Sequence, residues 1–126
     1  MRSSLIDLSS IPAPEVVINR QRLNAALILE VSGTVDMVTG PQLLAAVRSA
    51  LAEGPEKLVI DLTGVTFLAA AGLHVLDVAR EEAGDAVVLA VVAHGPATAR
   101  PIEITGLDVI VDLYPTVDDV MSSHAA

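Results

Sequence analysis

Two stretches that alternate little between apolar and polar residues, each followed by a stretch with helical spacing, constrain the fold of this 126-residue chain most strongly. They are residues 57–62 (KLVIDL) and 86–92 (AVVLAVV). A strand that alternates so little between apolar and polar residues is typical of a sheet that is covered on both faces. Strands that alternate with helices along a chain are joined by right-handed crossovers, so these stretches predict a parallel or mixed sheet.

The remaining elements extend this pattern to the order β-β-α-β-α-β-α-β-α. Residues 16–22 and 25–32 predict an antiparallel hairpin with a tight turn at Leu23-Asn24. A helix is expected to begin at Thr39, with Gln42 as its capping-box partner, and to end before Gly54-Pro55. Further expected elements are a helix over 72–83, a short helix from His94-Gly95-Pro96 to near Gly106, a strand over 109–113 and a final helix capped by Thr116 with Asp119. The expected fold is therefore α/β, with a mixed, mostly parallel sheet of about five strands and about four flanking helices.

Length and composition predict one domain. The chain is 52% hydrophobic but has only two aromatic residues, Phe67 and Tyr114, and an aliphatic core of this kind suits helices packed on a sheet. Residues 1–14 (MRSSLIDLSSIPAP) are rich in Ser and Pro and predict a loose N-terminal arm, whose Leu5, Ile6 and Leu8 could dock against the domain edge. The single domain is expected to span residues 15–123.

The net charge and the absence of cysteine disfavour or exclude some classes of binding partner and of chemical site. The net charge of -9 disfavours nucleic acid and anionic membrane surfaces as partners, because an acidic surface repels phosphate. Cysteine is absent, which excludes disulfides, thiolate metal sites and a cysteine nucleophile. The longest apolar run, residues 86–93, is too short to span a bilayer, and the N-terminus is a poor signal peptide. The cytoplasm is the expected location.

Catalytic motifs are missing from the sequence. Gly64 and Gly72 match neither a P-loop nor a dinucleotide-binding loop, and no nucleophile elbow is present. His74, Asp77 and Glu81 share one helical face and could form a metal or acid/base site, although a solvent-exposed face explains them better. Asp61, at the end of its predicted strand, could cap a turn or contact a partner, and the structural role is the better explanation.

The junction between the strand at 57–62 and the next helix carries three consecutive alanines, Ala69 to Ala71, where α/β proteins usually carry polar groups. The surrounding stretch, IDLTGVTFLAAAGLHVL, resembles the signature of the STAS domain, named for sulfate transporters and anti-sigma-factor antagonists. SGTVDMVTGPQL and GPATARPIEITGLDVIVDLYPTVDDVM resemble two further family segments, in the family's order and spacing. The resemblance covers about residues 16–121.

This resemblance implies a mixed sheet flanked by helices and, for small cytoplasmic bacterial members, binding to a kinase-type anti-sigma factor. The hydroxyl that such a kinase phosphorylates falls on Ala71, and the preceding aspartate of the signature falls on Ala69. Gly72 and Leu73 match the signature. A phosphate at the start of a helix is stabilised by free N–H groups and adds nearly two negative charges to the surface. An alanine has no oxygen to phosphorylate, so we expect the STAS fold without its phosphorylation switch.

We therefore expect a non-enzymatic regulator that binds a kinase-type anti-sigma factor or another regulatory protein, with no cofactor and no metal, as a monomer or weak homodimer. The alternative is a small-molecule or lipid-binding STAS module of a transport system. Pro101 is expected either to kink the third helix or to mark a helix that begins late. The expected binding surface comprises Asp36, Thr39, Thr66, Ala69, Ala70, Ala71 and Gly72.

Overall fold

The computed structural model describes residues 14–123, in which five strands form one sheet in the order β1-β2-β3-β4-β5. β1 and β2 are antiparallel and the other neighbours are parallel, as the sequence predicted. The predicted arm lies outside the described residues except for Pro14. The strands are β1 (Val16–Leu23), β2 (Ala26–Val35), β3 (Lys57–Leu68), β4 (Val88–Val92) and β5 (Asp112–Tyr114). The helices are α1 (Gly40–Ala52), α2 (Ala70–Ala83), α3 (Ala99–Ile104), the 3-10 helix η2 (Leu107–Val109) and α4 (Val117–Ser123).

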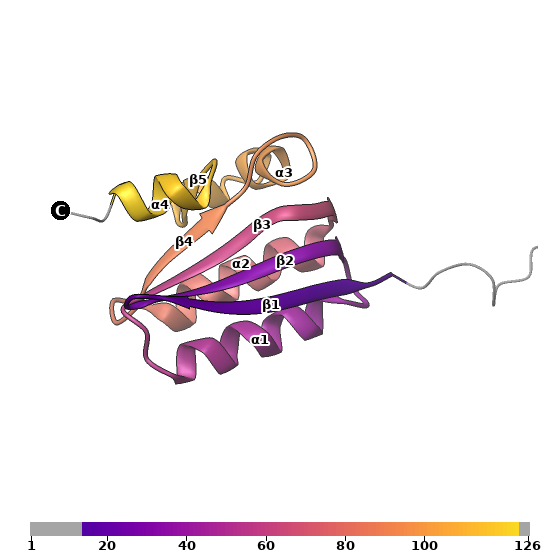
Figure 1. The fold of residues 1–126 in the computed structure, drawn as a ribbon. Helices are drawn as coiled ribbons and strands as arrows, with labels where there is room; N and C mark the ends of the chain where they lie inside the picture. The colour runs from indigo at the N-terminus through magenta and orange to yellow at the C-terminus, as the bar shows by residue number, and fades with distance from the viewer. Residues whose placement is uncertain (1–13, 124–126) are drawn as a thin grey trace, which may run out of the picture.

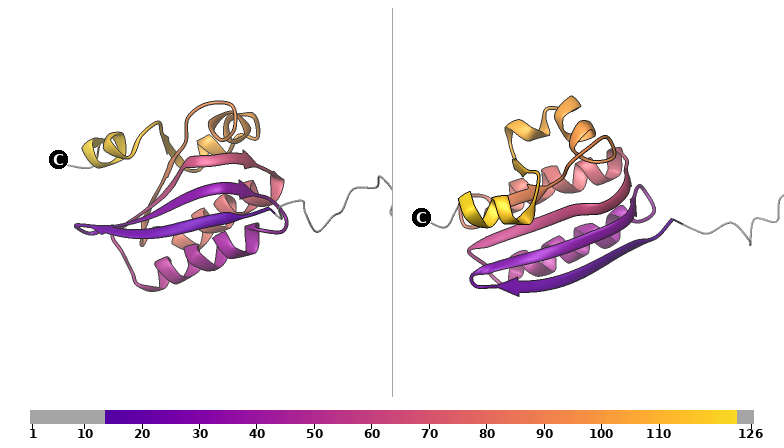
Figure 2. Two further views of the ribbon diagram at one scale, coloured as in Figure 1. Left: turned by 45° about the vertical axis from the view of Figure 1, so that its right-hand side comes forward. Right: turned by 45° about the horizontal axis from the view of Figure 1, so that its top comes forward.

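Helices α1 and α2 lie side by side on one face of the sheet (Figure 1). The main core lies between them and the strands, and its fully buried side chains include Leu29, Leu43, Ile60 and Leu76. The opposite face is covered over β3 and β4 by α4 (Figure 2). Val120 of α4 packs there with Val59 and Val92. The paired parts of β3 and β4 are therefore buried on both faces, which explains why their sequences alternate so little between apolar and polar residues.

The strand boundaries differ from the expected ones around β3. This strand continues to Leu68, because after its pairing with β4 ends at Asp61 it still pairs with β2. Asp61 therefore lies within a strand and not at its end, which corrects the prediction. Its carboxylate accepts a hydrogen bond from the Thr63 amide at 2.9 Å, so it stabilises the local backbone where the β2–β3 register shifts.

The C-terminal third also differs in detail. The strand expected over 109–113 begins only at Asp112, as β5, because Val109 belongs to the 3-10 helix Leu107–Val109. α3 begins at Ala99, so Pro101 lies in its first turn, where no helical hydrogen bond needs its missing N–H. The expectation of a late-starting helix is confirmed, and no kink is needed. Thr116 caps α4 as predicted, since its Oγ1 accepts a hydrogen bond from the Asp119 amide at 3.0 Å.

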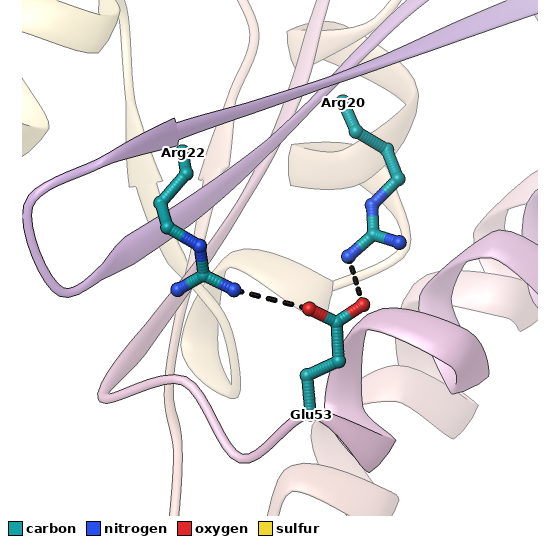
Figure 3. A network of polar contacts seen from close by, with 3 residues as sticks. All are labelled: Arg20, Arg22 and Glu53. Carbon is teal, nitrogen blue, oxygen red and sulfur yellow. Dashed lines mark hydrogen bonds and ion pairs between the residues drawn. The ribbon is translucent and has the colours of Figure 1, made fainter.

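Ion pairs on the surface join α1 and the residue that follows it to β1 and α2. Glu53, which follows α1, pairs with both Arg20 and Arg22 on one face of β1, its Oε1 lying 3.0 Å from Arg22 (Figure 3). On the other side, Arg48 forms a bidentate pair with Glu82 of α2, at 2.7 and 3.1 Å. Exposed pairs of this kind stabilise little, about 0–1 kcal/mol each, so they add little to the packing of α1 on the sheet.

Candidate functional site

The candidate site lies at the sheet edge where β2 and β3 end. Leu68 pairs with Val35 at the ends of the two strands, and the Ala69 amide donates a hydrogen bond to the Val35 carbonyl at 2.8 Å. The first turns of α1 and α2 are also adjacent, since a Cβ placed on Gly40 would lie 3.7 Å from the Cβ of Ala71. The structure thus brings the Asp36 loop and the three alanines to one edge.

Asp36 organises the loop between β2 and α1. Its Oδ1 accepts hydrogen bonds from the amides of Val38 and Thr39, at 2.9 and 3.0 Å. The amide of Thr39, followed by that of Val38, stabilises the ionised carboxylate and lowers the pKa of Asp36 below its ordinary value. The negative charge of Asp36 is therefore held in a fixed position just before α1.

Thr39 does not cap α1 in the expected way. The helix has no side-chain cap, and the exposed Gln42 is joined to Thr39 only through the backbone. The Thr39 hydroxyl instead donates to the Thr34 carbonyl at 2.7 Å and accepts from the Asp36 amide at 3.0 Å. Thr39 is also fully buried, so its side chain is not part of the surface that a partner would touch. Its hydrogen bonds stabilise the loop between β2 and α1.

The alanine segment forms an uncapped start to α2. Ala69 occupies the N-cap position with extended backbone (φ -88°, ψ 177°) and forms no side-chain cap. Ala70 is exposed, whereas Ala69 and Ala71 are half-buried. The first turn of α2 contains no acidic residue of its own that would offset the positive end of the helix dipole.

Gly72 is buried beneath this turn. A Cβ added there would lie 2.5 Å from Leu68 Cδ1 and 2.7 Å from Val35 Cγ1, so the glycine lets α2 approach the strands closely. Like Thr39, Gly72 shapes the predicted surface without being exposed on it. Thr66 is exposed, and its hydroxyl donates to the Gly33 carbonyl at 3.2 Å, across the shifted part of the β2–β3 ladder.

Three exposed apolar side chains at this edge were not predicted. Met37 and Val38, in the Asp36 loop, are 81% and 62% exposed, and Phe67, near the end of β3, is 56% exposed. Phe67 is paired with Thr34, so it lies one strand away from the residues that lead into the loop. We call Met37, Val38 and Phe67 the edge patch. One sign of this patch was present in the sequence: two apolar residues lie between Asp36 and Thr39, in a segment that fits neither the predicted strand nor the predicted helix.

Other candidate chemistry lies elsewhere in the molecule. His74, Asp77 and Glu81 are exposed along α2, and residues 14–123 contain no group of three acidic or histidine side chains arranged to hold a metal ion. Cavities of about 380 and 440 Å³ lie along the C-terminal half of α2 and η2, around Arg80, and not at the start of α2. Within the same described residues, no helix combines the length and the apolar character that crossing a membrane requires.

Comparison with known proteins gives a consistent assignment. The model of the STAS domain family matches residues 17–120. The anti-sigma-F factor antagonist RsfB of Mycobacterium tuberculosis is 37% identical over 99 residues, which cover 79% of this chain and 81% of RsfB. The crystal structure of an anti-sigma factor antagonist from Mycobacterium paratuberculosis superposes with a TM-score of 0.86 at 40% identity, covering 92% of this chain and all of that one. Unphosphorylated SpoIIAA, at 13% identity and a TM-score of 0.68, shares the fold over 87% of this chain and 98% of its own.

Proposed function

This chain belongs to the STAS domain family, and from this premise we propose that it is an anti-sigma-factor antagonist that binds a kinase-type anti-sigma factor without being phosphorylated at the start of α2. Two relatives at 37% and 40% identity carry the name of anti-sigma factor antagonist, which is a regulatory and not an enzymatic role. The proposed function is therefore binding.

The observation that carries the proposal is the partly exposed, uncapped first turn of α2 beside the Asp36 loop. A partner that docks on this edge meets free helix N–H groups, the fixed carboxylate of Asp36 and the apolar side chains of the edge patch. An interface with an apolar centre and a few placed polar groups is the usual composition of a specific protein contact. The docking surface comprises Asp36, Met37, Val38, Thr66, Phe67, Ala69, Ala70 and Ala71, with Thr39 and Gly72 beneath it.

The absence of a hydroxyl at Ala71 determines how binding is controlled. A phosphoryl group at this position would place nearly two negative charges at the centre of the docking surface and oppose a partner that buries it. Ala69, Ala70 and Ala71 cannot carry that group. In this proposal the protein stays in its binding-competent form, and its activity is set by its amount or by another input.

The proposal is tested by placing a permanent charge at the helix start. An anti-sigma factor recovered by pull-down from the source cell, and identified by mass spectrometry, would be titrated by calorimetry with wild type and with Ala71→Glu. The helix dipole tolerates a carboxylate in the first turn, so the variant is expected to stay folded. Its binding is expected to weaken at least about a hundredfold, because the new charge would be buried in the complex without a counter-ion.

Ala86→Glu is the matched control. Ala86 is an exposed alanine just before β4, at the opposite edge of the sheet, so the same substitution there adds the same charge away from the docking surface. Its affinity should match that of wild type, and melting curves should show that both variants are folded. Wild-type affinity in a folded Ala71→Glu protein would exclude the start of α2 as the interface.

A further inference from the structure

A groove runs along the C-terminal half of α2, at the other end of that helix from the docking surface. Two adjoining hollows of about 380 and 440 Å³ form it, and the lining residues that they share are Arg80, Gly84, Val109 and Ile110. Arg80 joins the two sides, since its Nε donates to the Ile110 carbonyl at 2.9 Å and its Nη1 to the Gly84 carbonyl at 3.0 Å. Arg80 is roughly 14 Å along the helix from Ala71, so a partner in this groove does not have to touch the first turn of α2.

One wall of the groove presents apolar side chains to water. Val109 is 84% exposed, and Ile110 and Val88 are 44% and 42% exposed. All three line the first hollow, so they face the same space. Exposed apolar side chains that gather in one hollow, in contrast to ones scattered singly, mark a surface that another molecule covers.

The rest of the groove is acidic. Four exposed carboxylates line it, and Arg80 is the one basic residue among the described residues that does so. Both Arg80 hydrogen bonds go to backbone carbonyls, and within residues 14–123 none of the four carboxylates forms an ion pair. The lining therefore has an excess of negative charge beside its apolar wall. The four carboxylates belong to Asp77, Glu81, Asp85 and Asp112.

This charge selects the kind of occupant. Anionic lipid and nucleic acid would be repelled by the carboxylates. A second copy of this chain is also disfavoured, because each copy has a net charge of -9 and its Arg20, Arg22 and Arg48 already pair with carboxylates. A protein segment that carries Lys or Arg beside aliphatic side chains matches both parts of the groove, since complementary potentials favour and orient association.

We propose that this groove is a second docking site, which binds a basic amphipathic segment of a partner protein. The aliphatic side chains of that segment cover Val88, Val109 and Ile110, and its cationic side chains face the four carboxylates. The groove and the docking surface lie at opposite ends of α2, so both can be occupied at once. The proposal does not depend on the proposed function, because no anti-sigma factor is needed to fill the groove.

The test uses a synthetic peptide in place of the partner. The probe is an amphipathic peptide with blocked ends that contains only leucine and lysine at helical spacing, and its control has glutamate in place of every lysine. Each would be titrated into the isotope-labelled full-length protein while amide chemical shifts are followed by NMR. The lysine peptide should shift residues 77–88 and 109–112 and leave residues 36–39 and 69–72 unchanged. The glutamate peptide should shift none of them.

A matched pair of valines separates the apolar wall from general attraction. Val109→Ser should weaken the affinity for the lysine peptide roughly fivefold, because an apolar contact is lost. Val17→Ser is the control, at a valine that is 52% exposed on β1 and does not line the groove. Its affinity should stay within about twofold of that of wild type, as expected for an exposed side chain outside the contact.

A second matched pair separates the local carboxylates from the overall negative charge. Asp77→Asn/Glu81→Gln should weaken binding roughly tenfold at low salt, and by less as the salt concentration rises. Glu15→Gln/Glu30→Gln removes the same charge from exposed residues outside the groove, and its affinity should stay within about twofold of wild type.

Three results would overturn the proposal: no binding of the lysine peptide, shifts confined to the docking surface, or equal losses of affinity in the groove variants and their controls. The last would mean that the peptide responds to net charge alone. Melting curves would show that the variants are folded. None of these results depends on whether Ala71→Glu weakens binding of the anti-sigma factor, so the two proposals fail separately.

Discussion

Gly72 lies so close to Val35 that a Cβ added to the glycine would come within 2.7 Å of Val35 Cγ1. The contact joins the first turn of α2 to the last residue of β2, and so holds the two halves of the docking surface together. Gly40, at the start of α1, differs, because a Cβ there would meet its nearest neighbour, Ala71 Cβ, at an ordinary 3.7 Å. We therefore expect alanine to destabilise the protein at Gly72 and to change its stability little at Gly40.

Gly72→Ala should lower the free energy of unfolding by about 1–2 kcal/mol, since overpacking against Val35 and Leu68 exceeds the helix propensity that alanine adds. Gly40→Ala should change it by less than about 0.5 kcal/mol. Urea titrations of the two variants would measure both values. Equal stability of the two variants would show that Val35 and Leu68 can move aside for an added methyl group, and would contradict a tight contact at Gly72.

Thr39→Val should destabilise the protein by about 1–3 kcal/mol, because valine keeps the shape but leaves the partly buried Thr34 carbonyl and Asp36 amide without the hydroxyl. The control is Thr66→Val, at an exposed threonine with a single long hydrogen bond, where the loss should be below about 0.5 kcal/mol. Hydrogen exchange should also show faster opening at residues 36–39 in Thr39→Val. A stable Thr39→Val protein with slow exchange there would mean that the loop is held by Asp36 alone.

Asp36→Asn should remove one component of the pH dependence of stability. The folded-state pKa of Asp36 is lowered from 3.8, so its carboxylate stabilises the fold above that value and loses its effect as the pH falls through the lower folded-state pKa. Asparagine offers the same oxygen without the charge. The difference in unfolding free energy between wild type and Asp36→Asn should therefore be largest at pH values well above 3.8 and should shrink as the pH falls below 3.8. A difference that does not vary with pH would contradict the charge-based account.

Ala71→Ser should make the protein a substrate of the anti-sigma factor recovered in the pull-down, if that partner is a kinase as proposed. Incubation with the kinase and ATP should add one phosphate to the variant, mapped by mass spectrometry to position 71. Wild type should gain none at residues 69–71. Phosphate on Thr66 of wild type would instead show that the switch has moved to the nearest well-placed hydroxyl.

The order of elements was determined by local sequence alone. The apolar residues of β3 and β4, the helix that ends at Gly84 and the Thr116–Asp119 cap are all local signals, because propensity and capping act between residues close in the chain. The missing hydroxyl at Ala71 is equally a property of the sequence. The STAS resemblance placed this position at the start of a helix, and the structure has α2 beginning one residue before it.

Tertiary structure decided which of these residues lie on the surface. Thr39 is buried where its hydroxyl donates to the Thr34 carbonyl at the end of β2, and Gly72 is buried because α2 packs on Val35. Met37 and Phe67 are exposed for the converse reason, since no described element packs over this edge of the sheet. The position of the β1 start beside the docking surface follows from antiparallel pairing with β2. Pairing and packing join residues far apart in the chain, so periodicity could not reveal them.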